Sequence, residues 1–468
     1  MIDGMGDSER GDHSADGVGA TGTLAAPADA MAVHSLPTGE SSRIATLDVY
    51  RGVALCGILL LNIIGFGLPG PLMESPFDFG IESWVDELVA YVMQLVFSDT
   101  MRGSFSLLFG AGVVLLTSRL EQDGRSAADI HYRRNIWLIV FGVIHAYILL
   151  WPGDILYRYG IASLFLYPFR KVRPALLILL GVLCILPMNA RDVMTFVNER
   201  DVEAQIEVIQ ATVARGEALS QDDQETLDAW TEERGSAEQW QEEVDEHMRE
   251  MLDGYTGPFV DGLERNVEIQ STEIYKWTLW DALVFMFLGM ALFKLGVLSG
   301  ERSTRFYVTL IAIGYPIGLL IRWWLLSLWT TPDVPKSAIA LGFLVFEPAR
   351  VLMTLAHLSV VMLLCRANVL GRVKAGLAAA GRMALTNYVG HTVICNSLFL
   401  GFGLGWYGKL TQAELLLVVI GVWLVQIPFS GLWLRFFRFG PLEWLWRSLT
   451  YVKWQPMRRT SHRPATRA

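Results

Sequence analysis

The sequence lacks the residue clusters from which disulfide frameworks, metal centres and nucleotide sites are usually built. It has only four cysteines, each alone within an apolar run: Cys56, Cys184, Cys365 and Cys395. Isolated cysteines fit neither a disulfide framework nor a zinc site, so we expect them in the core. His145, His357 and His391 lie in separate apolar segments without ligand spacing, and there is no P-loop or dinucleotide-binding glycine pattern. No metal site is therefore predicted.

The amino-terminal region also has little that could form a folded core. Residues 1–42 are rich in glycine, alanine, aspartate and serine and show no apolar periodicity, which predicts a disordered tail. They have neither the basic start nor the apolar core of a signal peptide.

Apolar residues dominate the rest of the chain. The 468 residues are 52% hydrophobic, include 16 tryptophans and have a mean hydropathy of +0.37, which excludes an ordinary soluble globular protein. We predict an all-α, polytopic membrane helix bundle with about ten transmembrane helices. The predicted spans are 47–68, 104–116, 136–151, 155–169, 176–188, 280–298, 308–329, 338–364, 384–400 and 415–434. The amphipathic segment 81–97 is expected to lie at the interface or against the bundle.

One long segment interrupts this pattern. Residues 191–276 contain 23 acidic and 7 basic residues and two helical runs with few large apolar side chains. This segment is predicted to be an acidic helical insertion between two membrane halves, 43–190 and 277–451, with a basic tail at 452–468.

Basic residues alternate between the predicted loops and give the orientation. With ten spans and both termini in the cytoplasm, every basic cluster falls inside and the acidic insertion falls outside. The clusters are Arg119, Arg125, Arg133 and Arg134; Arg170, Lys171 and Arg173; Arg302 and Arg305; Arg366, Arg372 and Lys374; and Arg435, Arg438, Lys453, Arg458 and Arg459. An inner bacterial membrane is the expected location, and the acidic insertion disfavours a nucleic-acid partner.

Polar residues within the spans are the candidate site, because a charge near the middle of a bilayer costs about 2.5–3.5 kcal/mol. Asp48 and Arg51 share a helix face, with Asn62 about 16 Å beyond Arg51; the pair could instead hold the helix end at the interface. The expected substrate-binding residues of a polar cavity are Arg51, Asn62, Arg158, Arg322, Glu347, Arg350 and Asn387.

His145 is the candidate general base. A neutral imidazole can take a proton from a hydroxyl or amine, Asp154 at a helix start could orient it, and Arg158 could hold an anionic group. The alternative is that His145 is a buried, hydrogen-bonded histidine and Asp154 only a helix cap.

Several motifs together resemble the YeiB-like proteins, a bacterial membrane family of undefined function. They are Asp48-x-x-Arg51-Gly52-x-Ala54-Leu55 followed by Asn62, FSLLFGAG, His145, GDIL at 153–156, GRMALTNY at 381–388 and GPLEWLWRSLTY at 440–451. The first is also similar to the opening helix of the heparan-glucosaminide N-acetyltransferases, with which that family is grouped as transmembrane acyltransferases. The resemblance implies handling of an acyl group, with an acyl-CoA or a lipid as donor.

The resemblance fails at one position. In those acetyltransferases the catalytic histidine follows the helix-end asparagine by about eleven residues, whereas residues 63–80 contain no histidine; Met73, Glu74 and Asp78 occupy that region. Either His145 or Glu74 has taken this role, or this branch does something else.

The predicted function is therefore transfer or handling of an acyl group on a cell-envelope molecule. The competing function is transport or lipid binding in the same cavity, and a weaker one is a structural or sensing role of the acidic insertion. Expected partners are membrane lipid and, from the aromatic segments 324–329 and 442–447, a second copy in a homodimer.

Overall fold

The computed structural model describes residues 38–70, 77, 79–234, 237–331, 334–367 and 369–459. Most of the predicted tail, Met73, Glu74, Asp78 and residues 460–468 lie outside these ranges. The chain divides into two units, Met1–Ser41 and Ser42–Ala468. The contacts that form the bundle and the site lie within the second unit.

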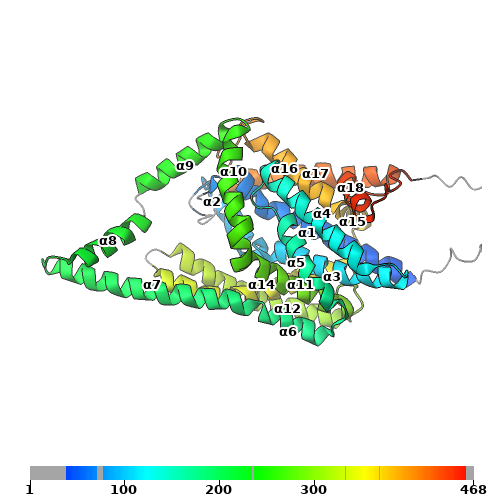
Figure 1. The fold of residues 1–468 in the computed structure, drawn as a ribbon, viewed down its shortest axis with the longest axis horizontal. Helices are drawn as coiled ribbons and strands as arrows, with labels where there is room; N and C mark the ends of the chain where they lie inside the picture. Colours follow the sequence, from blue (N-terminus) through cyan, green and yellow to red (C-terminus); the bar gives the residue numbers. More distant parts are fainter. Residues whose placement is uncertain are drawn as a thin grey trace, which may run out of the picture. The chain divides into compact units, whose positions relative to one another are not determined.

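The described residues form helices and no β-strand, which confirms the all-α prediction (Figure 1). The first membrane half contains α1 (Thr38–Gly67), α2 (Trp84–Val92), a π-helical turn η3 (Met93–Phe97), α3 (Thr100–Gln122), α4 (Ala127–Tyr147), α5 (Leu156–Leu166), η4 (Tyr167–Lys171) and α6 (Pro174–Leu183). The second contains α11 (Leu279–Lys294), α12 (Thr304–Thr330), α13 (Lys336–Phe343), α14 (Phe346–Arg366), α15 (Gly371–Arg382), α16 (Ala384–Phe399), α17 (Gln412–Phe436) and α18 (Pro441–Tyr451).

Seven helical segments of the described residues are long and apolar enough to cross a membrane, so the protein is a membrane protein. They are Ala45–Gly67, Trp84–Gln122, Pro174–Ala214, Thr256–Lys294, Thr304–Thr330, Phe346–Arg366 and Gln412–Phe436. The predicted count of about ten is not confirmed. α5 and α16 have only 11 and 16 residues, and α4 is polar over its first half.

The acidic insertion is built on extensions of membrane helices. α6 leads into α7 (Ile185–Ala214), and α8 (Gln221–Arg234) and α9 (Ala237–Leu252) follow. α10 (Thr256–Glu268) then continues through the π-helical segment η5 (Ile269–Thr278) into α11 without a break. The insertion returns to the bundle at the end of α9, where the Gly401 N–H donates to the Met251 carbonyl at 3.1 Å.

Small residues let helices of the bundle approach closely. A Cβ atom at Gly110 of α3 would collide with the Met286 carbonyl of α11, and one at Gly289 of α11 would collide with the Leu107 carbonyl of α3. Gly112, two residues further along α3, has open space beside it.

Candidate functional site

A cavity of about 910 Å³ lies among the membrane helices and the insertion. Four of the predicted binding residues line it: Asn62, Arg158, Arg322 and Glu347. The sequence did not single out the other polar residues of its walls, which include Asp99, Arg102, Arg191, Asp192, His247, Asp261, Arg265, Glu273 and Asn396. The cavity thus collects polar groups from both membrane halves and from the insertion.

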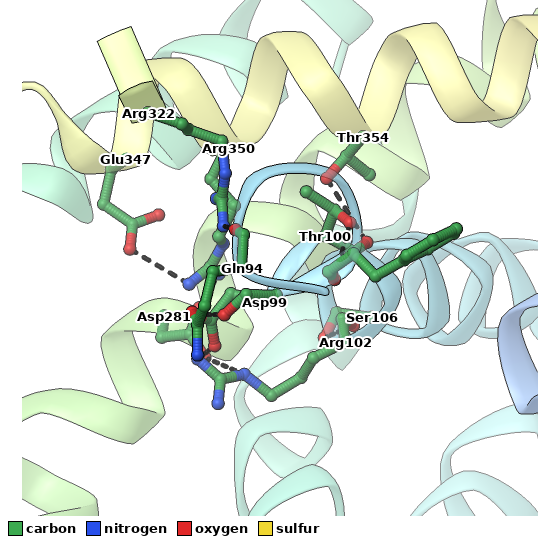
Figure 2. A network of polar contacts seen from close by, with 12 residues as sticks. Gln94, Asp99, Thr100, Arg102, Ser106, Asp281, Arg322, Glu347, Arg350 and Thr354 are labelled. Atoms are coloured by element: carbon green, nitrogen blue, oxygen red, sulfur yellow. Dashed lines mark hydrogen bonds and ion pairs between the residues drawn. The ribbon is translucent and has the colours of Figure 1, made fainter. Parts of the chain in front are cut away.

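Asp99, Arg102 and Glu347 of the cavity lining belong to a chain of ion pairs (Figure 2). Arg102 pairs with Asp99 at 2.8 Å and with Asp281 at 3.2 Å. Asp281 also pairs with Arg350, whose Nη1 donates to Glu347 at 3.1 Å. Asp281, Glu347 and Arg350 are all buried, so each charge depends on its neighbours for the stabilisation that water would otherwise provide.

Local backbone structure positions the Asp99 end of this chain. The π-helical turn η3 ends at Phe97, and Asp99 has a φ of 58° immediately before α3. A non-glycine residue in the left-handed region is uncommon, and aspartate tolerates it better than most residues. The turn places Asp99 one helical turn before Arg102, the spacing at which their side chains meet.

Arg322 of α12 lies beside this chain of ion pairs, as Figure 2 shows. Its Nη2 donates to the carbonyl of Gln94, which belongs to η3. Its Nε and Nη1 are buried and have no hydrogen-bond partner among the described residues. Arg322 is only 6% exposed, so most of its donors are withdrawn from water and left unused.

His145 and Asp154 lie together, as the catalytic hypothesis requires. The Nδ1 of His145 is 2.7 Å from Asp154 Oδ1, and its Nε2 is 2.8 Å from the hydroxyl of Thr392. Asp154 Oδ2 accepts the Tyr157 N–H at 2.8 Å and so caps α5, which confirms the predicted cap. The hydroxyl of Thr392 from α16, the imidazole of His145 from α4 and the carboxylate of Asp154 just before α5 thus form a hydrogen-bonded series.

This series does not line the cavity. His145, Asp154 and Thr392 are buried, and both ring nitrogens of His145 already have partners. The neighbours of Asp154 in sequence, Trp151, Pro152, Gly153 and Ile155, line the cavity instead. In this conformation, His145 therefore fits the alternative of a buried histidine with both ring nitrogens hydrogen-bonded as well as it fits a general base.

Two predicted binding residues lie elsewhere in the bundle. Arg51 pairs with Asp48 at 2.9 Å, and Asn387 donates to the Ser430 hydroxyl at 2.9 Å and to the Ala380 carbonyl at 3.3 Å. Neither residue is among those that line the cavity. Arg350 also lies outside the lining, but it holds Glu347, which is part of it.

The sequence contained a signal for one of the missed pairs. Asp99 and Arg102 have the acid-x-x-arginine spacing of Asp48 and Arg51 and of Glu347 and Arg350, and all three pairs form ion pairs in the structure. Asp281 could have been noticed as a lone carboxylate in an apolar run. Thr392 had no signal of its own.

On the insertion side of the cavity, His247, Glu250 and Asp261 could in principle hold a metal ion, because their ligand atoms lie within 4.8 Å of one another. His247 Nδ1 is already 3.3 Å from Asp261 Oδ1, and its Nε2 is hydrogen-bonded to the Tyr407 hydroxyl at 3.0 Å. Burial raises the pKa of the Tyr407 phenol, so that hydroxyl keeps its proton at neutral pH. These bonds give His247 a structural role without a metal.

Comparison with known proteins agrees with the motifs. The family model described as "Protein of unknown function (DUF418)" matches residues 292–453. The uncharacterized protein YeiB of Escherichia coli (strain K12) is 31% identical over 426 residues, which cover 86% of this chain and 95% of YeiB. The chain belongs to the YeiB-like family.

A second relative also matches over nearly its whole length. The uncharacterized protein YxaH of Bacillus subtilis (strain 168) is 27% identical over 441 residues, covering 90% of this chain and 97% of YxaH. No solved structure matches the chain.

Proposed function

We propose that this protein binds an acyl-bearing molecule of the cell envelope in its cavity, as a lipid-binding or transport protein. The observation that carries the proposal is the two-sided lining of the cavity. α12 and α13 contribute an apolar wall that includes Leu325, Leu326, Leu328, Trp329, Ile339 and Phe343. α3, α5 and α14 contribute charged groups. Such a lining suits a molecule with an apolar chain and a polar head.

The size of the cavity supports the same kind of ligand. Its volume of about 910 Å³ lies near the upper end of ordinary small-molecule sites, which span about 300–1,000 Å³. A single ion or a small metabolite would leave most of this space unfilled. A molecule with a long acyl chain would use it.

The setting of this proposal is the inner membrane of a bacterium, with both termini in the cytoplasm and the acidic insertion outside. The alternation of basic loops supports that orientation. A homodimer is also part of the proposal, supported by exposed Trp323 and Trp324 on α12. Trp444 and Trp446 give it no support, because their indole N–H groups donate within the chain, to Gln455 and Arg134.

Acyl transfer is the second candidate, and the Thr392–His145–Asp154 series favours it. A histidine between a hydroxyl and a carboxylate is the arrangement in which a base removes a hydroxyl proton while the carboxylate orients the ring. For transfer, the segment from Trp151 to Ile155 would have to move so that the substrate reaches the imidazole. The same base could then act on an acceptor hydroxyl in place of Thr392.

One experiment separates these functions. Purified protein in nanodiscs is incubated with labelled long-chain acyl-CoA or acyl-lipid donors and with lipid and glycan acceptors, and both bound ligand and product are measured. His145→Gln should lower product formation by about 10²- to 10⁴-fold if His145 is the base. His131→Gln is the matched control, because His131 lies on the same helix, is equally buried and bonds only to the backbone of Ser163 and to Asn135.

Each outcome decides between the candidates. Acyl ligand bound without any product supports lipid binding or transport and removes acyl transfer. Product formed equally by wild type and His145→Gln contradicts the His145 mechanism. If no acyl-bearing probe binds to the wild-type protein, the proposed function itself is wrong.

A further inference from the structure

We propose that the ligand of the cavity carries a phosphate group on its head, and that Arg158 and Arg322 bind it; neither arginine has a carboxylate partner among the described residues. The inference rests on the proposed function, because it names the class of acyl-bearing molecule that the cavity accepts: a phospholipid-like anion.

Arg322 provides the first observation. A buried guanidinium is stable only when its charge and its N–H groups are compensated. Arg322 makes one hydrogen bond, to the Gln94 carbonyl, while its Nε and Nη1 have no partner among the described residues. Buried polar atoms are nearly always hydrogen-bonded, so unused donors at a cavity wall indicate an acceptor that occupies the cavity.

Arg158 provides a second, independent observation from a different helix. It lies in the first turn of α5 and lines the same cavity. Its Nη1 is buried without a hydrogen-bond partner, and no carboxylate lies within ion-pair distance of it in the described part of the chain. Asp154, the nearest acid in sequence, is already bonded to His145 and to the Tyr157 N–H.

The carboxylates of the lining do not neutralise these two arginines by direct contact. Each has its own basic partner: Asp99 with Arg102, Asp192 with Arg191, Asp261 with His247, Glu273 with Lys276 and Glu347 with Arg350. Asp99 attracts Arg322, and Asp154 attracts Arg158, but neither acid is close enough to its arginine to form an ion pair. Among the described residues of the lining, the buried groups without a hydrogen-bond partner include the indole N–H of Trp151, the Thr278 hydroxyl and Glu347 Oε2 as well as the guanidinium groups of Arg158 and Arg322. The two guanidinium groups carry the positive charge that favours an anionic acceptor.

The arrangement of the donors favours phosphate over a carboxylate. Arg102, which pairs with Asp99, lines the same cavity as Arg158 and Arg322. Arg158 and Arg322 come from different helices, α5 and α12, so an acceptor with oxygens pointing in several directions suits both. A phosphate offers tetrahedral oxygens and up to two negative charges, and arginine is the side chain best suited to bind it.

Binding of three probes to the full-length protein in nanodiscs of uncharged lipid tests the inference. The probes are phosphatidic acid, diacylglycerol with the same acyl chains, and glycerol 3-phosphate. Phosphatidic acid is expected to bind about tenfold or more tightly than diacylglycerol, the range of a charge-assisted hydrogen bond. Glycerol 3-phosphate should bind much more weakly, because it lacks the chains that fill the apolar side.

Arg322→Gln and Arg158→Gln should each lower the affinity for phosphatidic acid toward that for diacylglycerol, so that most of this preference is lost. Arg170→Gln is the control, because Arg170 is half-buried and paired with Glu121 outside the cavity lining. Thermal unfolding of all variants identifies any that fail to fold. Because the two arginines are substituted separately, the test can be made with one variant if the other does not fold.

The outcomes are distinct from those of the proposed function. Equal affinities of the wild type for phosphatidic acid and diacylglycerol would overturn the phosphate site while leaving acyl binding intact. Equal affinities for glycerol 3-phosphate and phosphatidic acid would show that the acyl chains add nothing to binding, so the inference that the phosphate belongs to a lipid would be wrong. Binding of none of the three would count against both the phosphate site and the acyl-binding proposal.

Discussion

Arg350 is fully buried between Asp281 and Glu347, and both carboxylates depend on its charge. Replacing it with methionine keeps much of the side-chain volume but leaves the buried Glu347 without its ion-pair partner and Asp281 with Arg102 alone. Breaking a buried ion pair from one side costs about 3–5 kcal/mol. We therefore expect Arg350→Met to lower the unfolding midpoint strongly in mild detergent, measured by circular dichroism or by a thiol-reactive dye.

Arg51→Met is the matched control for that substitution. Arg51 has the same acid-x-x-arginine spacing, but its side chain is 31% exposed. A partly exposed pair contributes about 0–1 kcal/mol, so this variant should unfold close to the wild type. Equal, small effects of the two substitutions would show that the ion-pair chain is not needed for stability.

Residue spacing predicts pairs within one helix and fails for pairs between helices. Three residues on a helix bring two side chains together wherever the helix lies, so the Glu347–Arg350 pair could be read from the sequence. Thr392 is 247 residues from His145, and their hydrogen bond depends on the packing of α16 against α4 and α5. No local pattern contains that information.

At the scale of elements, the contact between α3 and α11 depends on glycine. Gly110→Ala places a methyl group against the Met286 carbonyl, and the helices must separate. Overpacking of this kind costs about 1–3 kcal/mol. We expect Gly110→Ala to unfold at a lower temperature than wild type in the same detergent.

Gly112→Ala, two residues further along α3, is the control for that contact. Nothing lies within 4 Å of a Cβ atom at Gly112, so the methyl group is accommodated. Alanine is favoured over glycine within a helix by about 1 kcal/mol, so this variant should be at least as stable as the wild type. A loss of stability at Gly112 equal to that at Gly110 would contradict the packing account.

The number of helices shows that hydropathy does not predict where one helix ends and the next begins. The predicted single span 338–364 is two helices, α13 and α14, which are separated at Leu344 and Val345. Pro348 contributes to this break, because it has no N–H to donate to the Leu344 carbonyl and its ring disfavours a continuous helix there. Apolar residues continue through the break, so composition alone does not reveal it.

At the scale of the whole molecule, the orientation in the membrane is the first property to test. In a cysteine-free background, Ala218→Cys between α7 and α8 should react with an impermeant thiol reagent on intact cells. Asp123→Cys between α3 and α4 should react only after the cells are opened. Both positions are exposed in the structure, so accessibility within the fold does not bias the comparison. Labelling of position 123 from outside, with position 218 protected, would reverse the orientation.

The continuous segment Thr256–Lys294 joins two opposite parts of the molecule. Its 39 residues amount to a rod about 58 Å long. Near its start the segment carries Asp261 and Arg265, which line the cavity from the insertion, and further along it carries Asp281, which is held in the ion-pair chain by Arg102 and Arg350. Beyond Asp281, the close approach of Gly289 to the Leu107 carbonyl holds the segment against α3. Because no break in the helix separates Asp261 from Asp281, a ligand that displaces this segment moves the insertion and the ion-pair chain together.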